Sequence, residues 1–72
     1  MENSVEFQFD TEMSAYRFLN TVKHVDADGL RAKFGQTDHH VSVKYTYIVG
    51  EFDETLSILD DLARELGGIE VS

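Results

Sequence analysis

The chain has 72 residues, and 14 acidic against six basic side chains give it a formal net charge of −8. The absence of cysteine excludes disulfide bonds, thiolate metal sites and a thiol nucleophile. At 42% hydrophobic residues the chain is too apolar for a disordered acidic segment, yet no apolar run approaches the roughly 20 residues that cross a bilayer. We therefore expect one small cytoplasmic domain over residues 1–72 with no membrane association.

The first part of the chain predicts a strand followed by a helix. Apolar and polar side chains alternate over residues 4–10, which is typical of a strand with one buried face. Apolar residues then recur at helical spacing over residues 11–26, with Asp10 or Thr11 as the N-cap. The turn-forming residues at positions 26–29 are expected to end this helix.

The middle of the chain predicts an antiparallel hairpin. Alternation resumes over residues 30–35 and again, after a short polar loop, over residues 40–49. The side chains expected to face the core from these two strands are Leu30, Ala32, Phe34, Val41, Val43, Tyr45, Tyr47 and Val49.

The last part predicts a second helix and a short strand. Asp53 is the expected N-cap of a helix over residues 53–66, and Gly67-Gly68 is a strong helix stop because glycine adopts the left-handed conformation readily. Residues 69–72 are long enough for a final strand only. The order β-α-β-β-α-β predicts a ferredoxin-like α+β sandwich, an antiparallel sheet with both helices on one face. The alternative is an open β-α-β-β-α unit whose last four residues trail.

The uncovered face of the predicted sheet is close to neutral, so the excess negative charge lies elsewhere. Its expected charged residues are three acids and three bases: Glu6, Asp10, Glu70, Arg31, Lys33 and Lys44. Nucleic-acid affinity comes largely from Lys and Arg contacts to phosphates, and no aromatic ring is expected on this face, so the sequence argues against nucleic acid as a ligand. The acidic remainder fits a solvated surface, a docking face for a basic partner, or adaptation to salt.

The sequence offers one pattern with metal-binding residue types, Asp38-His39-His40 in the hairpin loop. Imidazole suits zinc, nickel or copper, which makes His39 and His40 candidate metal ligands. Neighbouring residues at the start of a strand point to opposite sides, however, so exposed loop histidines are the simpler interpretation. No cofactor is expected.

Catalytic patterns are missing from the sequence. None of its serines lies in a glycine-flanked nucleophile elbow, and no glycine-rich phosphate loop follows a strand. Asp10-Thr11-Glu12-Met13 occupies the loop in which heavy-metal-associated domains, which have the same order of elements, carry a Cys-x-x-Cys site. The resemblance is therefore one of topology alone. We do not expect an enzyme.

Two functions follow from these observations. The first is a non-enzymatic interaction module that binds a partner protein or a second copy of itself, with edge strands as the preferred contact. Its candidate partner-binding residues are Arg31, Lys33, Lys44 and Ile48, the last an apolar residue among polar ones on the uncovered face. The second is a small-ligand or metal-binding regulatory domain that uses the two loop histidines, or the three basic residues for an anion.

Overall fold

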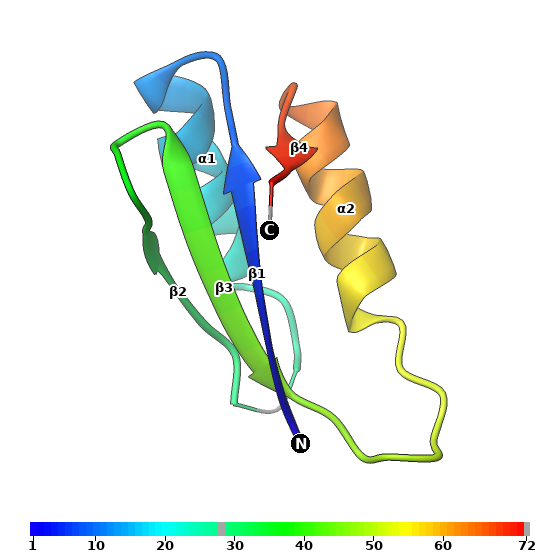
Figure 1. Cartoon of the computed structure of the whole chain (residues 1–72). Coiled ribbons are helices and arrows are strands. Elements are labelled where there is room, and N and C mark those ends of the chain that lie inside the picture. Colours follow the sequence, from blue (N-terminus) through cyan, green and yellow to red (C-terminus); the bar gives the residue numbers. More distant parts are fainter. Residues whose placement is uncertain (28, 72) are drawn as a thin grey trace.

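The fold is a two-layer α+β sandwich of the ferredoxin-like type, as the sequence predicted (Figure 1). The computed structural model describes residues 1–27 and 29–71. One four-stranded sheet has the order β2-β3-β1-β4, and every neighbouring pair is antiparallel. The elements are β1 (Glu2–Gln8), α1 (Glu12–Val22), β2 (Arg31–Phe34), β3 (His40–Thr46), α2 (Thr55–Glu65) and β4 (Ile69–Glu70).

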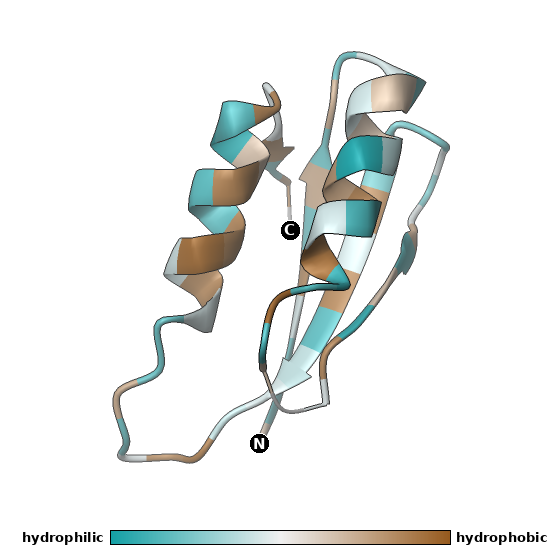
Figure 2. Cartoon of the chain, turned by 180° about the vertical axis from the view of Figure 1, so that it is seen from behind, coloured by the Kyte–Doolittle hydropathy of each residue, from teal (hydrophilic) through white to brown (hydrophobic). Residues whose placement is uncertain are grey.

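Both helices lie on the same side of the sheet (Figure 2). The buried residues of the core come from both layers. Alternate side chains of β1 and β3 and one stripe of each helix supply it, which confirms the period-two and helical patterns read from the sequence. The ring of Phe18 on α1 packs between two rings from the first strand and its end, with centroid distances of 5.1 Å to Phe7 and 5.0 Å to Phe9. The fully or nearly fully buried residues of the core include Phe7, Phe9, Phe18, Val22, Val41, Val43 and Leu59.

Helix α1 begins as predicted and ends earlier than predicted. The Thr11 hydroxyl accepts a hydrogen bond from the Ser14 backbone N–H at 3.0 Å, so Thr11 rather than Asp10 is the N-cap. The predicted helix to residue 26 is wrong, because α1 stops at Val22. His24 and Val25 then donate to carbonyls three residues earlier, which closes tight turns instead of continuing the helix. The predicted turn at residues 26–29 includes position 28, which lies outside the described residues.

Strand β3 also ends early, at Thr46, opposite Glu2 of β1, instead of at residue 49. The last residue of this segment that pairs with the start of the chain is Tyr47, whose N–H donates to the Met1 carbonyl and whose carbonyl accepts from the Met1 amine. Ile48 and Val49 are therefore in a loop, with 63% and 68% of their surface exposed. The expected placements of Val49 in the core and of Ile48 on the sheet face are both wrong.

Helix α2 is set by signals at both ends. The Asp53 carboxylate accepts the Thr55 N–H at 2.8 Å, and the helix runs from Thr55 rather than from residue 53. At the other end Gly67 adopts a φ of +80°. The Gly67 N–H donates to Arg64 and the Gly68 N–H to Ala63, the hydrogen-bond pair of a Schellman ending.

The short strands differ from the prediction in length and, for β4, in register. β2 covers residues 31–34 rather than 30–35, and Phe34 at its end is 38% exposed instead of buried. β4 covers Ile69–Glu70 rather than residues 69–72, and residue 72 lies outside the described residues. Glu70 lies opposite the core residue Phe7 and therefore faces the helix layer, so its expected place on the uncovered face is wrong. Ile69, opposite Gln8, is on that face instead.

Candidate functional site

Three of the six basic side chains meet on the uncovered sheet face. Arg31 of β2 lies directly opposite Lys44 of β3, and Lys33 lies opposite Ser42 in the same pair of strands. Together they surround a depression of about 340 Å³ on β2 and β3. We call Arg31, Lys33 and Lys44 the basic cluster. The sequence predicted all three members, and the strand pairing brings them together.

No carboxylate of the described residues forms a salt bridge with the basic cluster. The salt bridges of the described residues join His39 to Asp38 and Arg64 to Asp61, and neither involves a member of the cluster. Glu6, whose strand position is opposite Ser42, accepts a hydrogen bond from the Gln36 amide at 3.1 Å. Like charges directly opposite each other in a sheet are destabilising, so this arrangement costs the fold stability that an external anionic group can offset.

The outer edge of β2 presents backbone groups as well as charge. In β3 the odd-numbered residues bond to β1, as Tyr47 with Met1 shows, and the even-numbered ones bond to β2, as His40 with Gly35 shows. In an antiparallel ladder this alternation turns the N–H and C=O groups of Ala32 and Phe34 away from β3. Within residues 1–27 and 29–71, no hydrogen bond joins these groups to another part of the chain. Figure 1 shows β2 at the margin of the sheet, with no strand beyond it.

A small depression, lined by five apolar residues and by Lys23, lies on the other side of β2. It measures about 270 Å³ and is formed where the end of α1 approaches the start of β2, by Val22, Lys23, Val25, Ala27, Leu30 and Ala32. Sequence reasoning assigned most of these residues to the core and missed the depression. Its only sequence signal is the apolar stripe of α1, which ends beside Leu30. We call it the apolar depression after its five apolar residues, although polar atoms make up more of its exposed lining than apolar atoms do.

The two predicted metal ligands, His39 in the hairpin loop and His40 at the start of β3, are held by their neighbours. His39 Nδ1 lies 2.8 Å from the Asp38 carboxylate, and His40 Nδ1 lies 2.7 Å from the Thr37 hydroxyl. In the part of the chain that the structure describes, no group of three or more His, Cys, Asp or Glu side chains is arranged to hold a metal ion. The structure therefore adds no further ligand to the predicted pair.

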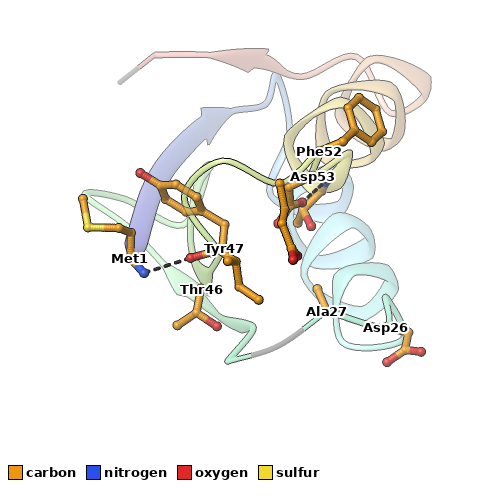
Figure 3. Close-up of a pocket in the computed structure, with 10 residues that line it drawn as sticks. Met1, Asp26, Ala27, Thr46, Tyr47, Phe52 and Asp53 are labelled. Atoms are coloured by element: carbon orange, nitrogen blue, oxygen red, sulfur yellow. Dashed lines mark hydrogen bonds between the residues drawn. The ribbon is translucent and has the colours of Figure 1, made fainter.

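Ile48 lies apart from the basic cluster. It lines a different hollow, of about 580 Å³, with Met1, Tyr47 and the loop that leads to α2. Figure 3 shows Asp53 and Phe52 on this loop, and Asp26 and Ala27 on the loop after α1. The Phe52 side chain is 91% exposed, which sequence reasoning did not anticipate. The Thr55 hydroxyl and backbone N–H donate to Asp53 and hold the pKa of its carboxyl below the ordinary value of 3.8.

Three features thus meet at the short strand β2: the basic cluster, an unpaired backbone edge and the apolar depression. Neither of the helices described has the length and hydrophobicity that a bilayer crossing requires. Comparison of the chain with protein-family models, with curated proteins and with solved structures found no match to any of them.

Proposed function

We propose that this domain is a non-enzymatic interaction module that binds an extended segment of a partner protein along the outer edge of β2. The observation that carries the proposal is the set of outward-facing backbone groups of Ala32 and Phe34, which bond to no other described residue. Such an edge is a ready template for strand addition, in which main-chain hydrogen bonds supply affinity.

The charge on β2 favours a partner protein over a second copy at this edge. Two copies paired through β2 would bring Arg31 and Lys33 close to the same residues of the other copy, in addition to the repulsion between two chains of charge −8. Self-association at another surface and a cytoplasmic location stay predictions from the sequence.

A second candidate is a site for a small anion at the basic cluster. The like-charged pair of Arg31 and Lys44 beside a depression of about 340 Å³ favours it. Inorganic phosphate added to the ¹⁵N-labelled chain would then shift the amide signals of β2 and β3 around the depression. Saturable shifts there, lost in Lys44→Gln, would support an anion site; their absence at millimolar phosphate would end this candidate.

The test of the interaction module begins with a random-peptide display library selected on the immobilised chain. The enriched peptides are then titrated into the ¹⁵N-labelled chain, and their sites are mapped from amide shifts. We expect the largest shifts at Ala32 and Phe34. Peptides that map to other surfaces, or a selection that enriches none, would overturn the proposal.

A matched pair of variants sharpens this test. Ala32→Pro removes an outward N–H that β3 does not use, and proline is tolerated on edge strands in that orientation. Loss of one such hydrogen bond is expected to weaken binding by about tenfold. Ala32→Val keeps the N–H but enlarges the side chain, so the affinity that Ala32→Pro loses beyond the loss in Ala32→Val measures the hydrogen bond. Amide spectra of both variants establish that the sheet is intact.

A further inference from the structure

We infer that the segment bound by β2 alternates acidic with apolar residues and runs antiparallel to β2, as every neighbouring pair of strands in this sheet does. This inference rests on the proposed strand addition and names the chemistry of the partner. Its acidic side chains lie over the basic cluster, and its apolar side chains lie on the helix side, where the apolar depression receives one of them.

The two sides of β2 differ sharply in chemistry. Arg31 and Lys33 point to the uncovered face, while Ala32 lies on the helix side opposite the buried Val43. Ala32 and Leu30 form part of the wall of the apolar depression. Because an added strand continues the pleat of the sheet, its successive side chains fall alternately on these two sides. The edge therefore selects a partner segment with a period of two.

The charge of the cluster determines which residues suit the uncovered face. A carboxylate placed beside Arg31 or Lys33 gains an opposite charge across the strand pair, whereas a lysine would add to a surface already crowded with Lys44. No carboxylate among the described residues forms a salt bridge with these three side chains. A polyanion such as RNA could meet the charge, but its backbone offers no alternating donors and acceptors for Ala32 and Phe34.

The strand direction determines which residues of the segment carry the hydrogen bonds. In antiparallel pairing, residues directly opposite Ala32 and Phe34 exchange N–H and C=O bonds with them and share their side of the sheet. Those are the apolar residues of the segment. In parallel pairing the bonds would instead come from their neighbours, which are the acidic residues.

This relation gives a direct test with a short synthetic peptide that alternates glutamate and valine. In one analogue the backbone amides of the valines are N-methylated, and in a second those of the glutamates are. Each analogue therefore loses the backbone N–H donors along one of its two edges. Binding is measured from amide shifts of the ¹⁵N-labelled chain. We expect the parent and the glutamate-methylated peptide to bind alike, and the valine-methylated peptide to lose about tenfold or more in affinity.

Charge reversal provides the second arm. A lysine-valine peptide is expected not to bind the original chain but to bind Arg31→Glu/Lys33→Glu, whose fold is checked by its amide spectrum. Equal effects of both methylation patterns, a larger effect at glutamate, or binding of the lysine-valine peptide to the original chain would each overturn the inference. Display-selected peptides that bind β2 without alternating charge would overturn it as well while leaving the interaction module intact. Failure of every peptide to reach β2 would overturn both.

Discussion

Gly68 lies so close to Phe9 that a Cβ atom added to the glycine would be 2.3 Å from Cε2 of the phenylalanine ring. Phe9 is buried and packs on Phe18, so its ring has little room to move. Gly68 also donates its N–H to the Ala63 carbonyl at 2.7 Å, which ends α2. The contact thus joins the end of the second helix to the aromatic core.

Replacement of Gly68 by alanine is therefore expected to lower the free energy of unfolding by overpacking, by about 1–3 kcal/mol. Urea unfolding followed by circular dichroism measures this loss. Phe9→Leu should reduce the additional loss caused by Gly68→Ala, because it removes the ring atoms that the methyl group would meet. Additive losses in the double variant would show that the ring is not the obstacle.

Gly67→Ala is the matched control, since a Cβ there meets no atom within 4 Å. Its φ of +80° makes an alanine unfavourable for conformational reasons alone, at about 1–2 kcal/mol. Phe9→Leu should leave this cost unchanged. A coupling between Phe9 and Gly67 as large as that between Phe9 and Gly68 would contradict the steric explanation.

The core and the order of elements were predictable because they depend on local periodicity. The alternation from Val5 to Phe9, and that around Val43, identifies the buried face of each strand without knowledge of its neighbours. Strand ends depend on tertiary pairing. Nothing near Val49 in the sequence indicates that the pairing stops at Tyr47, so alternation alone places the end of the strand too late.

The candidate site was predictable in part for the same reason. Arg31, Lys33 and Lys44 share a face through alternation, and a hairpin places them side by side. The register of β4 was not predictable, because a strand of two residues is too short to show an alternation of apolar and polar side chains. The turn through Gly68 sets which of the two residues faces the helices. Predicting the apolar depression would require knowing that α1 stops at Val22. In the sequence the apolar stripe continues past this residue and conceals the end of the helix.

Two threonines, Thr11 at the N-cap of α1 and Thr21 within the helix, are expected to respond differently to substitution by alanine. Thr11→Ala removes the N-cap hydrogen bond to Ser14 and should destabilise the domain by about 1 kcal/mol. The Thr21 hydroxyl donates to the Arg17 carbonyl within the helix at 2.8 Å, where alanine is the better helix former. Thr21→Ala should leave the stability unchanged or raise it slightly. Thermal unfolding of both variants tests this, and equal losses would refute the capping role.

The like-charged pair on the uncovered face is expected to lower stability measurably. Lys44→Gln and Lys33→Gln change the net charge equally, but only Lys44 lies directly opposite Arg31. Lys44→Gln should therefore be the more stable of the two, by about 0.2–1 kcal/mol at low ionic strength. The difference should shrink in 1 M salt, where the Debye length falls to about 3 Å. A difference that persists in high salt would point to packing rather than charge.

The start of α2 is expected to make stability depend on pH through Asp53. Hydrogen bonds from the Thr55 hydroxyl and N–H lower the pKa of the Asp53 carboxyl in the folded chain below 3.8. A carboxyl whose pKa is lower in the folded than in the unfolded state stabilises the fold above the unfolded pKa, and this contribution is lost as the pH falls through the folded pKa. Asp53→Ala should therefore lower the melting temperature at pH 7 and have a smaller effect near pH 2.

Glu54→Ala provides the control for Asp53, because it removes the same charge from the neighbouring residue, whose side chain makes no capping hydrogen bond. It should change the melting temperature at pH 7 less than Asp53→Ala does, since both variants alter the interaction with the helix dipole but only one removes the bond to Thr55. Melting curves of the three proteins between pH 2 and pH 7 separate these effects. Parallel curves for the two variants would mean that charge near the helix start, and not the Asp53 hydrogen bonds, produces the pH dependence.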